Sequence, residues 1–158
     1  MCLTIDEAIS KFQDSVYRAS FSICRNQQDA EDITQETFIR YMRQRGKEFE
    51  SDEHVRAWLL RTAINLSKNL VHSFWRRNRS TLEEELAQVP VAEPKDRDLL
   101  ESVLELPEKY RIVIHLYYYE DYSVSEISQL LRISESSVKN RLLRGRRMLR
   151  FQIEEDEQ

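Results

Sequence analysis

The chain has 158 residues, with 24 Lys and Arg against 28 Asp and Glu, and it contains two Gly and three Pro. So few turn-forming residues, without a convincing run of alternating polar and apolar residues, predict an all-α protein of one domain or two small ones. No apolar run approaches the roughly 20 residues of a membrane span and no signal peptide opens the chain, so a cytoplasmic protein without membrane insertion is expected.

Metal and catalytic chemistry are not indicated by the residues that usually carry them. Cys2 and Cys24 lack the spacing of metal ligands and are interpreted as reduced thiols. The three histidines, His54, His72 and His115, are isolated, and no Gly-rich loop could hold a phosphate. The sequence therefore predicts no enzyme, no metal site and no cofactor.

Three amphipathic helices are predicted in the N-terminal half. Thr4 and Glu7 form a capping-box pair before the first, the second begins near Asp29 and ends at Gly46, and the third begins near Glu53. Their expected inward positions are Ile5, Ile9, Phe12, Val16, Ala19, Ile23, Ala30, Ile33, Thr37, Tyr41, Val55, Trp58, Leu59, Thr62, Leu66 and Leu70.

The helical pattern fails after residue 77. Pro90, Pro94 and four Glu residues lie between 78 and 97, which predicts a flexible linker between two small helical domains. The predicted divisions are a first domain at 1–77, the linker at 78–97, a second domain at 98–153 and an acidic tail at 154–158.

The second domain is expected to open with a short helix at 99–106. Pro107 suits the first turn of the next helix, which is expected to end at a turn at Glu120 and Asp121. The buried positions expected in this second helix are Tyr110, Val113, Ile114 and Tyr117.

The segment 122–150 predicts a helix-turn-helix. Ser123 and Glu126 form a capping box for its first helix, Arg132 takes a left-handed turn position, and Ser134 caps its second helix. In the second helix one inward stripe is formed by Val138, Leu142, Gly145 and Leu149. Off that stripe, the charged residues from Val138 to Arg150 are all basic: Lys139, Arg141, Arg144, Arg146, Arg147 and Arg150.

A helix that is apolar on one side and cationic around the rest suits the major groove of DNA. The alternative is a solvated basic face on an ordinary bundle helix, although such faces usually mix charge signs. Because the net charge of the whole chain is -4, DNA binding is expected to need a partner.

Three segments resemble the extracytoplasmic-function sigma factors, the minimal two-domain sigma subunits of bacterial RNA polymerase. They are residues 29–38, residues 56–59 with Asn65 and Asn69, and residues 106–108 followed by the helix-turn-helix. The resemblance covers roughly residues 5–150 and implies an alternative sigma factor. Its implied partners are the clamp helices and flap of core polymerase, promoter DNA and an anti-sigma factor.

The resemblance assigns core polymerase binding to residues 29–43. Asp32, Gln35 and Glu36 share one helix face there and would meet the clamp helices. The alternative is that acidic residues here merely complement the positive end of the helix, and this alternative is preferred for Asp29 and Glu31.

The resemblance also assigns reading of the opened promoter -10 element to residues 49–77. Asn65 matches a position that helps to hold a flipped base, or else it is a structural polar residue within the helix. Phe74 and Trp75 either stack on bases or, as we prefer, pack at the helix end, and aromatic residues are sparser than in primary sigma factors. The implied -10 DNA contacts are Arg61, Asn65, Lys68, Asn69, Arg76 and Arg77.

The helix-turn-helix is assigned to the promoter -35 element. In this sequence Asp121 and Arg132 replace small turn residues often seen in the family. The main alternative is a stand-alone helix-turn-helix regulator, which would normally need a dimerisation helix that is not evident. The expected -35 contacts are Ser136, Ser137, Lys139, Asn140, Arg141, Arg144 and Arg147.

Overall fold

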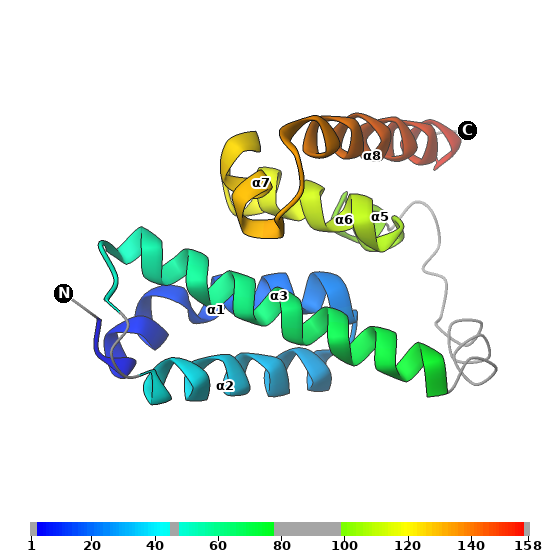
Figure 1. Cartoon of the computed structure of the whole chain (residues 1–158). Helices are drawn as coiled ribbons and strands as arrows, with labels where there is room; N and C mark the ends of the chain where they lie inside the picture. Colours follow the sequence, from blue (N-terminus) through cyan, green and yellow to red (C-terminus); the bar gives the residue numbers. More distant parts are fainter. Residues whose placement is uncertain (1–2, 45–47, 78–98, 157–158) are drawn as a thin grey trace. The chain divides into compact units, whose positions relative to one another are not determined.

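Over the residues that it describes, the computed structural model of the chain consists of α-helices (Figure 1) and one π-helical turn. No strand occurs in the part of the chain that is described, which agrees with the predicted all-α fold. The backbone is described for residues 3–44, 48–77 and 99–156, and side chains for 3–44, 48–73 and 101–150.

The chain divides into two compact units, Met1–Asn69 and Leu70–Gln158. The division falls inside a long helix, so the last turns of that helix continue beyond the first unit. The predicted linker at 78–97 lies outside the described residues, and the predicted domain boundaries stay predictions.

The N-terminal unit begins with two helices that pack against each other, α1 (Ile5–Cys24) and α2 (Gln27–Arg43). Between them Arg25 adopts a left-handed conformation with φ 52°. The side chain of Asn26 then accepts a hydrogen bond from the backbone N–H of Asp29 at 2.9 Å. Because Asn26 is the N-cap, α2 begins two residues before the predicted start at Asp29.

The third helix of this unit is α3 (Asp52–Arg77), and it completes the core with α1 and α2. Trp58 is half-buried and packs against this core, as predicted, with its ring 6.0 Å from that of Tyr41 and 6.1 Å from that of Phe49. The buried core residues are Ala8, Phe12, Val16, Ile33, Phe38, Tyr41, Phe49, Val55, Leu59 and Ala63.

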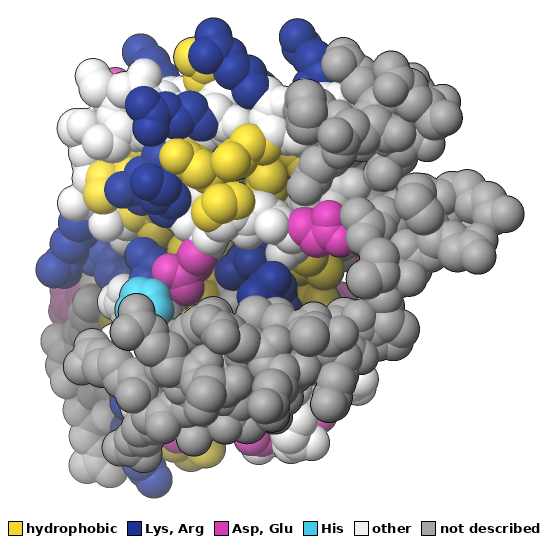
Figure 2. Space-filling view, turned by 90° about the vertical axis from the view of Figure 1, so that its right-hand side faces the viewer, with side chains coloured by type: hydrophobic (Ala, Val, Ile, Leu, Met, Phe, Trp, Pro, Cys, Tyr) yellow, Lys and Arg dark blue, Asp and Glu magenta, His cyan; other side chains and the backbone are white. Residues whose placement is uncertain are grey.

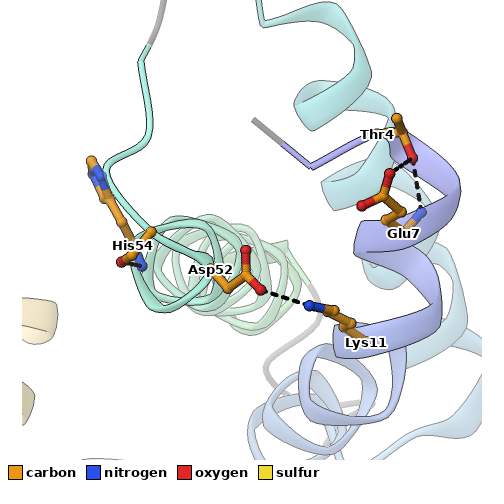
Figure 3. A network of polar contacts seen from close by, with 6 residues as sticks. Thr4, Glu7, Lys11, Asp52 and His54 are labelled. Carbon is orange, nitrogen blue, oxygen red and sulfur yellow. Dashed lines mark hydrogen bonds and ion pairs between the residues drawn. The ribbon is translucent and has the colours of Figure 1, made fainter. Parts of the chain in front are cut away.

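Polar contacts hold the starts of α1 and α3 (Figure 3). Thr4 caps α1 as predicted, but Glu7 accepts from the Thr4 hydroxyl at 3.0 Å, where a capping box would use the Thr4 backbone N–H. Lys11 of α1 points to Asp52, with Nζ 2.6 Å from Oδ2. At the start of α3, the His54 backbone N–H donates to the Ser51 hydroxyl at 3.1 Å.

After the end of α3, the first described helices of the C-terminal unit are α5 (Leu99–Leu104) and α6 (Glu108–Ile114). Pro107 is the N-cap of α6, one position before the first-turn place predicted for it. The turn between the helices is held by Arg111, whose Nη1 donates to the backbone oxygens of Leu104 and Leu106 at 3.1 Å each.

After α6 the helix widens into the π-helical turn η2 (His115–Tyr119), which the sequence analysis did not predict. The backbone N–H of Glu120 donates to the His115 carbonyl at 3.2 Å. The two buried side chains of these residues also meet, with His115 Nε2 3.2 Å from Glu120 Oε1. Asp121 then turns the chain with φ 59°, at the turn predicted from the sequence.

The helix-turn-helix is formed by α7 (Val124–Leu131) and α8 (Glu135–Asp156). Ser123 and Glu126 form both halves of the predicted capping box, at 3.0 and 3.1 Å. Ser134 accepts from the Ser137 backbone N–H at 3.1 Å, as predicted for an N-cap. Helix α8 continues to Asp156, so it includes the start of the predicted tail at 154–158.

Gly145 on the inner side of α8 allows a close approach to α6. A Cβ atom at this position would lie 3.0 Å from Ile114 Cγ1 and 3.5 Å from Tyr110 Cβ. This agrees with the place of Gly145 on the predicted inward stripe. Its missing side chain therefore lets α8 pack tightly on the rest of the unit.

Arg132 lies in the turn of the helix-turn-helix with φ 58°, as predicted from the sequence. We expect Arg132→Gly to raise the free energy of unfolding by about 0.5–1 kcal/mol, because glycine avoids the left-handed strain but is more flexible when unfolded. Urea unfolding of the full chain measures this. Arg18→Gly within α1 is the control and should destabilise by about 1 kcal/mol, whereas destabilisation by Arg132→Gly would contradict the strain argument.

Candidate nucleic-acid and protein interfaces

The predicted polymerase-binding residues lie on the solvent side of α2. Asp32 and Gln35 are exposed and Glu36 is half-buried, while the neighbouring Ile33 and Thr37 face the core. Gln28 Nε2 donates to Asp32 at 3.2 Å, and Arg40 Nε pairs with Glu36 at 3.1 Å. Helix α2 therefore brings the three predicted residues together on one polar face, where contacts within the helix hold the side chains of Asp32 and Glu36.

Met42 extends this face and was not predicted. It directly follows the inward position Tyr41, yet its side chain is 59% exposed. It follows Gln35 by seven residues, which is about two helical turns and hence the same side of α2. The spacing from Gln35 was the signal that could have identified an exposed apolar group here.

The predicted -10 residues form a stripe along α3. Asn65 and Asn69 are exposed and Arg61 and Lys68 are half-buried, opposite the buried side that includes Leu59. The last two predicted residues, Arg76 and Arg77, lie in the final turn of α3. Their side chains lie outside the described residues, as do those of Phe74 and Trp75.

Helix α8 has two opposite stripes. The inward stripe of Val138, Leu142, Gly145 and Leu149 is buried as predicted. Two residues away, which is about half a helical turn, an outward stripe repeats the same spacing. It consists of Ser136, Asn140, Leu143 and Arg147, all exposed.

Leu143 in this outward stripe was not among the predicted contacts, although its side chain is 44% exposed. The predicted contacts on this helix were polar or charged residues, and Leu143 is apolar. Its position is nevertheless fixed once the inward stripe is known, because Leu143 follows Asn140 by three residues and Ser136 by seven. An exposed apolar side chain at this place suits contact with the methyl group of thymine.

The other predicted -35 residues lie to the sides of the outward stripe or in the helix cap. Ser137 is half-buried, and its hydroxyl accepts from the Ser134 hydroxyl at 3.1 Å. Arg141 is half-buried and Arg144 exposed on one flank. A hydrogen bond from Arg144 is the main cause that lowers the pKa of the buried Tyr110.

The opposite flank of α8 carries Lys139, Arg146 and Arg150, all exposed. Arg146 is held by the tyrosines of η2, and its Nε donates to the Tyr118 hydroxyl at 2.6 Å. Lys and Arg side chains crowd the top of Figure 2, at the level of α8 in Figure 1, around a patch of hydrophobic side chains. Helix α8 is therefore cationic on both flanks and uncharged along most of its outward stripe.

Among the residues that the structure describes, no group of three or more His, Cys, Asp or Glu side chains could hold a metal ion. Over the same residues, no helix is both long and apolar enough to cross a membrane. The described groups that gather on the surface are instead polar and cationic stripes on α2, α3 and α8, which suit binding to large charged partners.

Comparison with known proteins gives two family matches. Residues 8–81 match the model of sigma-70 region 2, and residues 96–149 match that of sigma-70 region 4. The chain is 32% identical to the ECF RNA polymerase sigma factor SigE of Mycolicibacterium smegmatis, covering 92% of this chain and 60% of that protein. It is 30% identical to the ECF RNA polymerase sigma factor SigM of Bacillus subtilis, covering 94% of each.

A solved structure shows the same fold. It is the sigma factor RpoE in complex with the anti-sigma factor NepR from Bartonella quintana, with a TM-score of 0.69 and 18% identity. The match covers 94% of this chain and 96% of that one.

Proposed function

This chain belongs to the extracytoplasmic-function sigma factors of the sigma-70 family, and we propose that it directs core RNA polymerase to promoters through three surfaces. The first is the polar face of α2, the second the exposed stripe of α3 and the third the recognition helix α8. We place the domain that carries the first two at 1–77 and the domain that carries the third at 98–153. We further propose that the protein acts in the cytoplasm and without a catalytic group or cofactor of its own.

Core polymerase binding is proposed for Asp32, Gln35 and Glu36 on α2, with Met42 as an apolar neighbour. The acidic groups would meet basic side chains of the clamp helices and set orientation. Met42 would supply apolar contact area, which an exposed methionine offers to partners of varied shape.

DNA binding is proposed for α3 and α8. Along α3 the amides of Asn65 and Asn69 would bond unpaired bases of the opened -10 element, while Arg61 and Lys68 meet phosphates. The side chains of Arg76 and Arg77 would add phosphate contacts further along the strand. At the -35 element the outward stripe of α8 would face the base edges and its cationic flanks the two backbones.

We also propose that an anti-sigma factor binds this chain. The family resemblance implies such an inhibitor, and the RpoE structure of the same fold was solved with one. The flap of core polymerase is proposed as a further partner, which would support the C-terminal domain at the -35 element.

The single observation that favours a sigma factor over a stand-alone regulator is the match to region 2 over residues 8–81, beside the helix-turn-helix. A regulator that binds an operator needs no such domain. The two functions also differ in what they need to bind DNA, because a stand-alone regulator usually dimerises on paired half-sites.

We therefore expect the free chain to bind duplex promoter DNA weakly and the holoenzyme to bind it specifically. The chain has a net charge of -4 and one recognition helix, and its phosphate contacts weaken steeply as salt rises. Fluorescence anisotropy with and without core enzyme, at two salt concentrations, measures the difference. Tight, sequence-specific binding by the free chain as a dimer would favour the regulator.

A further inference from the structure

Arg146 is held in place by two neighbouring tyrosines. Its guanidinium carbon lies 5.5 Å from the ring centroids of both Tyr117 and Tyr118, and its Nε donates to the Tyr118 hydroxyl. The two rings pack edge to face, with centroids 4.9 Å apart. Such stacking fixes a long side chain that would otherwise lose conformational entropy when it binds a ligand.

The remaining polar groups of this cluster are hydrogen-bond donors, so they suit an anion as the ligand. A guanidinium has donors on Nε and on both Nη groups, and the Tyr118 contact uses only Nε. The Tyr118 oxygen accepts this bond, so its own O–H is a further donor, strengthened by the charge behind it. Within the described residues no carboxylate pairs with Arg146, and the Tyr118 side chain is 51% exposed.

The position of the cluster on α8 indicates where the anion comes from. Arg146 lies on the same flank as Lys139 and Arg150, beside the outward stripe that holds Leu143. A helix about 10–12 Å wide fills a major groove about 12 Å wide. When the outward stripe faces the bases, each flank therefore faces one phosphate backbone.

We propose that Tyr117, Tyr118 and Arg146 form a preorganised phosphate clamp on the DNA backbone that borders the -35 element. The Nη groups of Arg146 and the Tyr118 hydroxyl donate to one phosphate, and the rings hold the guanidinium in place. This inference rests on the proposed function, since it requires α8 to lie in the groove. An acidic protein surface would offer similar chemistry. The three cations of this flank, however, are spaced along the helix axis, as the phosphates of a DNA backbone beside the helix would be.

The test compares Arg146→Gln with the parent protein, both as holoenzyme, on promoter DNA at several salt concentrations. Loss of one phosphate contact should reduce the slope of log K against log salt by about 0.9, which is roughly a three- to fourfold change between 50 and 200 mM salt. Tyr118→Phe keeps the charge and the ring, so we expect severalfold weaker binding with the slope unchanged. Arg18→Gln on α1 removes the same charge elsewhere and should leave the slope as it is.

Three further measurements make the result decisive. Base discrimination should be unchanged in Arg146→Gln and reduced in Asn140→Ala. If Asn140→Ala loses discrimination but Arg146→Gln leaves both the affinity and the salt slope unchanged, the clamp is refuted while α8 in the groove is supported. If neither variant changes DNA binding, the proposed function of α8 fails as well. Weaker binding of core enzyme by Arg146→Gln would identify a protein partner for this cluster and overturn the clamp. A lowered melting temperature of Arg146→Gln with an unchanged salt slope would show that the cluster stabilises the fold, and it would also overturn the clamp.

Discussion

Replacing Glu36 with Lys is expected to weaken core polymerase binding by roughly thirtyfold, or about 2 kcal/mol. Glu36 lies half-buried on the polar face of α2, beside the exposed Asp32 and Gln35. A positive charge there would face the basic clamp surface that the proposed function assigns to this side. Repulsion between like charges across an interface costs more than the usual surface substitution, which changes stability by about 0.5 kcal/mol or less.

The pair between Glu36 and Arg40, at 3.1 Å, requires a control for the effect on the helix itself. Losing an exposed pair four residues apart costs about 0.3–0.5 kcal/mol of helix stability, and Arg40→Ala measures that part alone. Glu31→Lys makes the same charge change on α2, at an exposed site proposed only to complement the helix N-terminus. Titration of labelled core enzyme should separate the variants, and equal losses for Glu31→Lys and Glu36→Lys would remove the specific clamp assignment.

Local signals predicted the fold well where a side chain bonds its own neighbours. Ser123, Glu126 and Ser134 cap their helices as expected, because each cap needs only residues three positions apart. The same reasoning located the left-handed turn at Arg132. The predicted start of α2 was two residues late, because the N-cap is Asn26, which lies before the first apolar position of the helix at Ala30.

Contacts between distant parts of the sequence were beyond such reasoning. The bond between Tyr118 and Arg146 joins residues 28 positions apart, and it depends on how η2 packs beside α8. The π-helical turn itself has no local signal, because its extra residue is accommodated by packing around the buried His115 and Glu120.

The candidate sites show a different limit. Met42 and Leu143 were passed over because apolar residues in amphipathic helices are usually interpreted as core, yet their side chains are 59% and 44% exposed. Helix phase alone indicates the outward place of Leu143, opposite the stripe through Val138 and Leu142. What phase could not supply is whether another element covers that side, which only the packed structure answers.

The second large effect is expected from Asn65→Ala, which should reduce formation of the open complex by about tenfold while leaving initial promoter binding unchanged. The variant would lose the hydrogen bond between the Asn65 amide and the edge of an unpaired base. Such a loss costs about 1–3 kcal/mol when the partner of the bond is left unsatisfied. Duplex DNA hides that edge, so the loss should appear only after melting.

The fold should not suffer in this variant, because Asn65 is exposed and no described residue hydrogen-bonds its side chain. Alanine is also the better helix former, so α3 should gain a few tenths of a kcal/mol. Permanganate reactivity of unpaired thymines, followed at limiting holoenzyme, measures melting directly, and Gln13→Ala on α1 controls for loss of an exposed amide. Normal melting by Asn65→Ala would assign the residue to the helix surface alone, and the -10 contact would then have to be sought at Asn69, one turn along the same stripe.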